Sequence, residues 1–153
     1  MREIRFRGKR KDGGWEHGCL SVGRDGYEIV NTDGMGLFFH CPVDPSTVGQ
    51  YTGLKDKNGK EIYEGDIVLA PCAPCGKDKR SIKPHRCEVF WSQMGMPGWD
   101  LRILDYEPGV KWARGHLCLG REGDAFEVIG NIHDNPELLE EAIAKAKEGK
   151  ANG

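Results

Sequence analysis

Two cysteines near the middle of the chain have the spacing of a metal site. Cys72 and Cys75 are separated by two residues, and this gap lets both thiolates bind one zinc ion. His85 and Cys87 follow after nine further residues, 76–84. If 85–87 is extended, both of their side chains point to the same face and can complete a tetrahedral set. A structural zinc bound by Cys72, Cys75, His85 and Cys87 is therefore one hypothesis for this segment, and zinc is the single candidate cofactor.

Two other interpretations of these four residues stay open. In the first they are reduced thiols and an imidazole on a loop, with no metal bound. In the second Cys72 and Cys75 form a redox pair, which needs a helix N-terminus to lower a thiol pKa. Pro74 and the basic residues after it do not indicate such a helix.

Basic residues gather in two segments and define a nucleic-acid alternative. The loop over 77–86 could touch phosphates, but it lacks the interleaved aromatic residues that stack on bases. Its cations are Lys77, Lys79, Arg80, Lys83 and Arg86. Six of the first eleven residues are also basic, namely Arg2, Arg5, Arg7, Lys9, Arg10 and Lys11. The net charge of the whole chain is −2, so bulk electrostatics predict neither a nucleic-acid nor a membrane partner.

Catalytic motifs are absent from the sequence. No Gly-x-Ser-x-Gly elbow occurs, and the glycine-rich segments lack the Lys-Ser/Thr of a phosphate-binding loop. Glu64 and Asp66 are interpreted as turn-capping carboxylates at the start of a strand and not as an acid–base pair. We therefore expect no enzyme activity, and we assign no catalytic or cofactor-binding residue.

Length and composition indicate a small globular protein. The 153 residues are 38% apolar and 30% charged, and no apolar run approaches the ~20 residues of a membrane-spanning helix. The N-terminus alternates charged and apolar residues and so lacks the apolar stretch of a signal peptide. We expect a cytoplasmic protein whose six cysteines are reduced.

The elements that must position these residues are short strands separated by turns. The first half shows alternating residues at 4–7, a turn at Asp25-Gly26, an apolar run over 37–39, and prolines that make 41–49 a linker or edge segment. Asn58-Gly59 predicts a type I′ hairpin turn. Gly65 permits a bend before a strand at 66–69, and further strands are expected at 87–91, 99–104 and 126–132.

Helical periodicity is confined to the end of the chain. Asn135 suits an N-cap, Pro136 suits the first helical position, and an apolar stripe follows at Leu138, Leu139, Ala142, Ile143 and Ala146. The stripe predicts one helix over about 136–148 that packs on the rest of the protein.

Three stretches together resemble the YopX family of phage and prophage proteins. They are the opening residues 1–9, the segment 48–68 with its Gly-Lys-Glu-Ile-Tyr-Glu-Gly-Asp-Ile-Val sequence, and residues 128–139. The resemblance implies a phage or prophage origin, expression in the cytoplasm of a bacterial host, and an SH3-like barrel core. It implies no activity and no site residue. The cysteine- and lysine-rich insertion at 70–87 departs from the family pattern.

The expected fold is mainly β. An N-terminal β-hairpin region at 1–47, an SH3-like small β-barrel at 48–135 and a C-terminal α-helix at 136–149 would form one compact unit. The leading functional expectation is a binding or oligomerising module that makes protein contacts, assembled as a homo-oligomer through exposed strand edges. A nucleic-acid-binding module that uses the basic N-terminal strand and the 77–86 loop is the alternative. An enzyme of unrecognised type is the second alternative.

Overall fold

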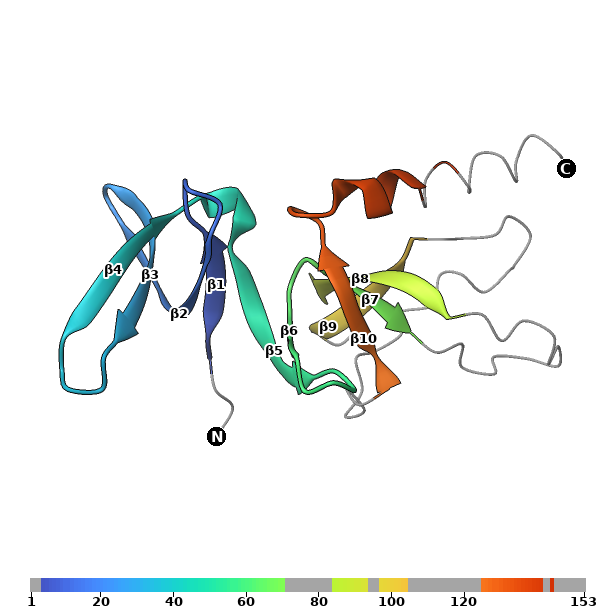
Figure 1. Cartoon of the computed structure of the whole chain (residues 1–153), viewed down its shortest axis with the longest axis horizontal. Coiled ribbons are helices and arrows are strands. Elements are labelled where there is room, and N and C mark those ends of the chain that lie inside the picture. The colour runs from blue at the N-terminus through green and yellow to red at the C-terminus, as the bar shows by residue number, and fades with distance from the viewer. Residues whose placement is uncertain (1–3, 71–83, 94–96, 105–124, 142–143, 145–153) are drawn as a thin grey trace, which may run out of the picture. The chain divides into compact units, whose positions relative to one another are not determined.

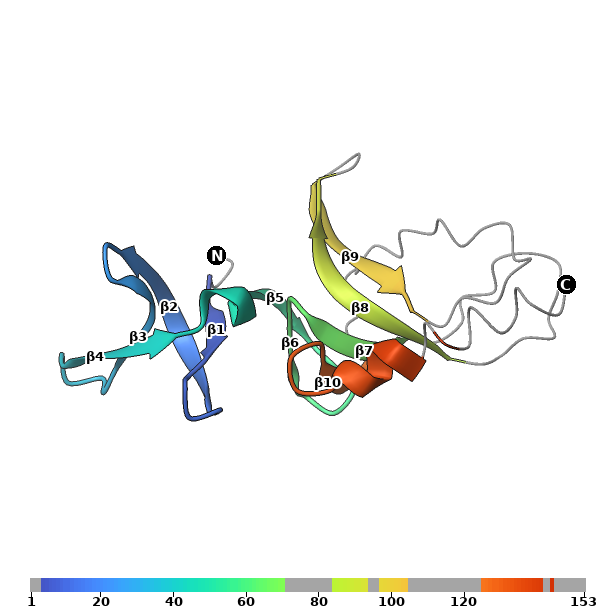
Figure 2. The same cartoon turned by 90° about the horizontal axis from the view of Figure 1, so that it is seen from above.

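The computed structural model describes residues 4–70, 84–93, 97–104, 125–141 and 144. These residues form two antiparallel sheets, with strand orders β4-β3-β2-β1-β5-β6 and β10-β7-β8-β9 (Figures 1 and 2). The elements are β1 (Phe6–Lys9), β2 (Trp15–Gly23), β3 (Gly26–Thr32), β4 (Phe38–Val43), the 3₁₀ helix η1 (Pro45–Thr47), β5 (Gly49–Lys55), β6 (Glu61–Tyr63), β7 (Asp66–Ala70), β8 (His85–Ser92), β9 (Gly98–Ile103) and β10 (Glu127–Asn131).

The chain divides into two compact units, Met1–Gly53 and Leu54–Gly153. Among the described residues, the strands form two open sheets and no closed barrel. The mainly β prediction is confirmed, but these strands do not close into the SH3-like barrel expected for 48–135. The physical reason is strand pairing, because β5 extends the first sheet beside β1 while β7 to β10 form a second one. No helix within the described residues is long and apolar enough to span a membrane.

The first unit is a meander whose sheet curls back on itself. Ile29 is fully buried on β3, and Val43 at the end of β4 lies over β1. A Cβ on Gly8 would be 2.7 Å from the Val43 side chain, so glycine at this position allows the close approach. The Asp44 N–H then donates to Lys9 O at 2.9 Å. One end of β4 is therefore joined to β1 by a hydrogen bond.

The hairpin between β5 and β6 is built on a buried carboxylate. Asp56 accepts hydrogen bonds from the backbone N–H groups of Asn58 (2.8 Å), Lys60 (2.9 Å) and Val128 (2.9 Å). The predicted type I′ turn is wrong, because it requires a positive φ at Asn58 and only Gly59 has one, at 80°. The turn instead closes through Gly59 N–H to Asp56 O and Asp56 N–H to Lys60 O.

The second unit has an apolar core between its strands. The core is a cluster of buried side chains from β6 to β9 and from the residue before β10: Ile62, Val68, Ala70, Cys87, Val89, Leu101 and Phe126. Gly65 makes the predicted bend with φ +79°, and its N–H and C=O bind Val89 O and the Ile132 N–H. Asp66, also buried, accepts the Tyr63 N–H at 2.8 Å, which confirms its turn-capping interpretation.

A polar turn leads from β10 into the C-terminal helix. Asn131 Oδ1 accepts the N–H groups of His133 and Asp134, both at 2.9 Å. Residues 136–141 and 144 are helical, and the rest of the predicted helix lies outside the described residues. A Cβ on Gly130 would be 3.1 Å from Leu138 Cδ1, so the helix packs over β10 through the predicted apolar stripe.

Candidate functional site

The structure describes half of the predicted zinc set. His85 and Cys87 lie on β8, two residues apart in an extended strand, as the prediction required. Cys87 is fully buried in the core of the second unit, and its Sγ donates to His85 O at 3.8 Å. Cys72 and Cys75 lie outside the described residues. Zinc binding therefore stays a prediction. Because Cys87 is buried in the core cluster, a zinc ion bound to its thiolate would have to lie at the margin of the apolar core.

No other metal site is found among the residues that the structure describes. Within them, no three His, Cys, Asp or Glu side chains are close enough together to hold an ion. The second unit's buried carboxylates are occupied by backbone donors, as at Asp56 and Asp66.

The basic N-terminal strand uses its cations inside the first unit. The Arg7 side chain is buried, with its guanidinium 4.7 Å from the Trp15 ring centroid. Arg10 pairs with Asp12 at 3.0 Å and with Glu16 at 2.7 Å. The Gly14 N–H and the Arg10 guanidinium hold the pKa of Asp12 below its usual range. The strand therefore offers a phosphate less positive charge than its sequence suggests.

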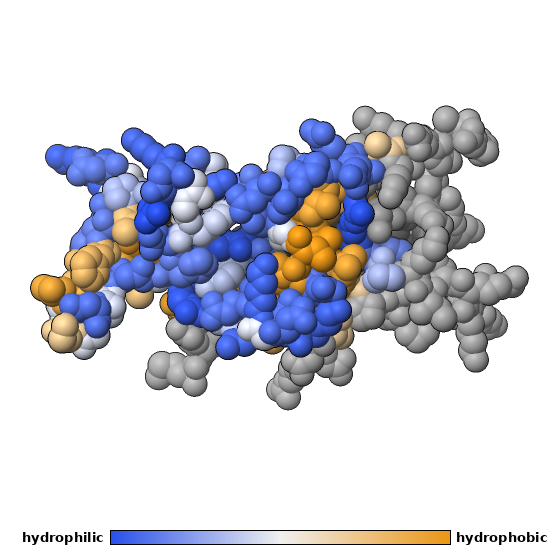
Figure 3. Space-filling view, viewed as in Figure 1, coloured by the Kyte–Doolittle hydropathy of each residue, from blue (hydrophilic) through white to orange (hydrophobic). Residues whose placement is uncertain are grey.

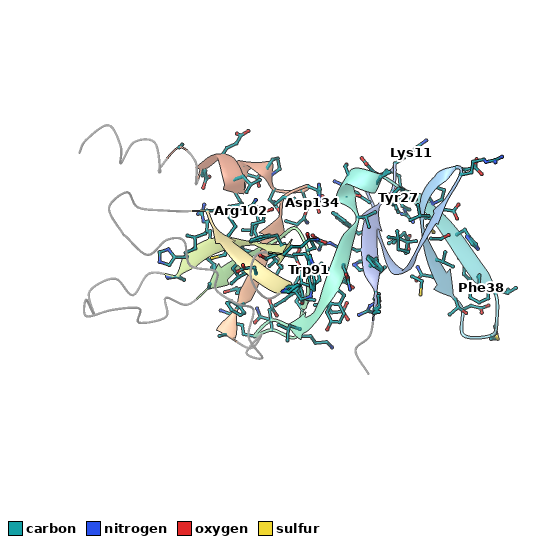
Figure 4. The ribbon with its side chains drawn as sticks, turned by 180° about the vertical axis from the view of Figure 1, so that it is seen from behind. Lys11, Tyr27, Phe38, Trp91, Arg102 and Asp134 are labelled. Atoms are coloured by element: carbon teal, nitrogen blue, oxygen red, sulfur yellow. The ribbon has the colours of Figure 1, made fainter. Side chains whose placement is uncertain are left out.

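The β3–β4 hairpin exposes an apolar surface. Met35, Leu37, Phe38 and Phe39 have exposed fractions of 89%, 64%, 68% and 53%. They lie in the β3–β4 turn and at the start of β4, and hydrophobic colours gather at one end of the first unit (Figure 3). Phe38 lies on the outermost strand of that sheet, close to the turn (Figure 4). These four residues are called the hairpin surface below.

The turn that carries the hairpin surface is held in shape by one carboxylate. Asp33 Oδ1 accepts the N–H groups of Met35 at 2.8 Å and Leu37 at 3.1 Å. The Asp33 N–H donates to Leu37 O at 3.2 Å. Gly34 and Gly36 provide positive φ values of 78° and 100°. The apolar side chains therefore project from an ordered turn and not from an irregular loop.

The outer edge of β4 presents backbone groups from alternate residues. The Asp33–Leu37 bond and the register Asn31↔Phe39 and Ile29↔Cys41 place the odd-numbered residues of β4 in hydrogen-bonded pairs with β3. The even-numbered residues must therefore point their N–H and C=O groups away from β3. Asp44 agrees with this alternation, because its N–H bonds to β1.

Pro42 also fits this alternation. It has no N–H and occupies an even-numbered position, where β3 needs no donor. The edge is therefore open at Phe38 and His40, which supply two N–H groups and two carbonyls, and Pro42 adds one carbonyl.

His40 carries the one ionisable imidazole on this edge. Its Nδ1 lies 3.0 Å from Glu28 Oε2 on β3. The remaining residues of β4 are Phe, Phe, Cys, Pro and Val, so the strand has no lysine, arginine or acidic side chain. Natural edge strands commonly carry such charges, because these charges discourage pairing with other chains.

The sequence predicted an edge segment at Pro42 but did not predict the exposed hairpin surface. The prolines led to the interpretation of 41–49 as a linker or edge segment, and β4 with Pro42 is indeed an edge strand. The exposure of 37–39 was not predicted. A signal was present, since three consecutive apolar residues in a strand cannot all face one side of a sheet.

Comparisons with known proteins agree with this fold. The family model described as YopX protein matches residues 22–140. Among solved structures, the chain is similar to protein EF1440 from Enterococcus faecalis, whose crystal structure superposes with a TM-score of 0.51 at 23% sequence identity. The match covers 91% of this chain and 99% of that one, and at this identity it shows the fold alone. A search of curated proteins finds no match.

Proposed function

The chain belongs to the YopX family, and from this premise we propose that it is a non-enzymatic binding module that works through protein contacts. We further propose that it is a phage or prophage accessory protein that acts in the cytoplasm of a bacterial host. The family resemblance supports this origin, and the hairpin surface supports the mode of action.

The observation that carries the proposal is the exposure of the hairpin surface. Burial of one large apolar side chain stabilises a complex by about 1.5–3 kcal/mol, before the costs of association. Four such side chains lie within five residues and are more than half exposed. Apolar residues grouped in this way mark interaction sites more often than scattered ones do.

The nucleic-acid alternative has less support from the described residues. Arg7 is buried against Trp15, and Arg10 is neutralised by Asp12 and Glu16. Most of the 77–86 loop, on which this alternative also depends, lies outside the described residues. An enzyme of unrecognised type has no described cluster of groups in its favour.

The test is capture of host and phage proteins from an infected-cell lysate on immobilised full-length chain. We expect proteins to be retained by the wild type after nuclease treatment and lost with a Leu37→Ser/Phe38→Ser variant. Val22→Ser is the matched control, because Val22 is an equally exposed apolar residue of the same unit that lies on β2.

Two results would contradict the proposal. Retention that disappears with nuclease would favour the nucleic-acid module. Equal retention by the wild type and the Leu37→Ser/Phe38→Ser variant would show that the hairpin surface makes no contact.

A further inference from the structure

The open edge of β4 is complementary to itself. Phe38 and His40 each direct one N–H and one C=O away from β3, as derived above from the register. If a second, antiparallel β4 places its His40 opposite Phe38, a two-fold axis places its Phe38 opposite His40. Each pair exchanges two hydrogen bonds, so four bonds form and every outward N–H of the segment is used.

We propose that the occupant of this edge is a second copy of the chain, paired through β4 in the register Phe38 to the partner's His40. This inference rests on the proposed function, since it identifies one protein that contacts the hairpin surface. The pairing is isologous and closes at two chains through this edge.

The side chains favour this register. The two-fold axis places Phe39 directly opposite the partner's Phe39, in a pair without mutual hydrogen bonds, where side chains approach closely. Phe39 is 53% exposed, although it shares a face with the buried Val43. On the other face, Phe38 lies beside the partner's imidazole. Aromatic cross-strand pairs of this kind stabilise paired strands.

The charges of β4 are compatible with a second copy at this edge. His40 Nδ1 lies 3.0 Å from Glu28 Oε2, and β4 has no other ionisable side chain except the Cys41 thiol. Two copies of this edge therefore bring no lysine, arginine or acidic side chain of β4 opposite one another.

The ends of the open segment limit the pairing. Pro42 lacks an N–H, and the Asp44 N–H is already bound to Lys9 O. The Asp33–Leu37 turn bounds the other end. The segment 38–41 between these limits has the length that the reciprocal Phe38–His40 pairing needs, and a longer ladder would lack backbone donors.

The first experiment is sedimentation velocity on the full-length chain at micromolar concentrations. We expect the wild type to dimerise and Phe39→Lys to weaken self-association about tenfold or more, because it places two ammonium groups opposite one another. Met35→Lys is the matched control: Met35 is exposed on the same hairpin but lies outside the paired segment, so this variant should still dimerise.

A backbone variant separates hydrogen bonding from side-chain packing. His40→Pro removes one outward N–H at a position equivalent to Pro42, where β3 needs no donor. We expect it to fold and to lose the dimer. If Phe39→Lys fails to fold, the His40→Pro variant still tests whether the dimer forms through β4.

Disulfide cross-linking tests the register. In a Cys19→Ser/Cys41→Ser background, Phe39→Cys should form a 39–39 cross-link, identified by peptide mass spectrometry, and His40→Cys should not. A cross-link at 40 instead would overturn the register. A monomeric wild type, or an unchanged dimer in both Phe39→Lys and His40→Pro, would overturn the pairing itself. Nuclease-resistant capture by a monomeric chain would leave the proposed function standing while this inference fails.

Discussion

Asp56 is a single buried carboxylate that joins segments 72 residues apart in the sequence. Burial raises its pKa, but hydrogen bonds from Val128, Lys60 and Asn58 outweigh that effect, so the pKa lies below the ordinary value of 3.8. A depressed pKa in the folded state means that the ionised group stabilises the fold above pH 3.8. This contribution is lost as pH falls from there through the lowered pKa.

We expect Asp56→Ala to destabilise the second unit by about 2–4 kcal/mol at pH 7, because three backbone N–H groups lose their acceptor. The measurement is urea unfolding at pH 7 and at pH 3. The difference between variant and wild type should shrink at the lower pH. A difference that is constant across this range would contradict the assignment.

Zinc is the prediction that rests on Cys72, Cys75, His85 and Cys87. If they bind the metal, protein purified without chelator should contain about one equivalent by elemental analysis, and Cys75→Ser should lose it. Cys19→Ser is the control, because Cys19 is an exposed cysteine of the first unit. Metal-free protein in which all six thiols titrate would eliminate the site.

Among the elements, the bend before β7 depends on one glycine. Gly65 has φ +79°, and both of its backbone groups are hydrogen-bonded to neighbouring segments. Gly65→Val should therefore cost about 1–3 kcal/mol, because a β-branched residue is strained in this conformation. Thermal unfolding measures the effect. Gly23→Val is the control, because a Cβ there meets open space without a positive φ, and equal stability of the two variants would argue against strain at Gly65.

Local patterns predicted most elements, and non-local contacts explain the failures. Alternation and turn residues located the strands β7 to β10 to within two residues. The prediction of a type I′ turn at Asn58-Gly59 was wrong because the Asp56 carboxylate, which also accepts the Val128 N–H, holds the turn in a different conformation. The exposure of Phe38 and Phe39 was not predicted, because consecutive apolar residues show that one of them faces away from the other but not whether another element covers the strand.

At the scale of the molecule, the two units should respond separately to core mutations. Ile29 and Ile67 are both fully buried, one in each unit. Ile29→Ala and Ile67→Ala should each cost about 2–5 kcal/mol. Hydrogen exchange should increase mainly in 4–53 for the first variant and in 54–70 and 84–93 for the second. Equal increases throughout for both variants would show that the chain unfolds as one cooperative unit.

The hydrogen-bonded turn at Asn58-Gly59 also affects how readily Asn58 can deamidate. Asn-Gly sequences deamidate when the glycine nitrogen attacks the preceding side-chain amide, and glycine leaves that nitrogen unhindered. Here the Gly59 N–H is bound to Asp56 O at 2.9 Å, and the Asn58 N–H is bound to the Asp56 carboxylate. We therefore expect Asn58 to deamidate more slowly in the folded protein than in the unfolded chain, where both of these hydrogen bonds are lost.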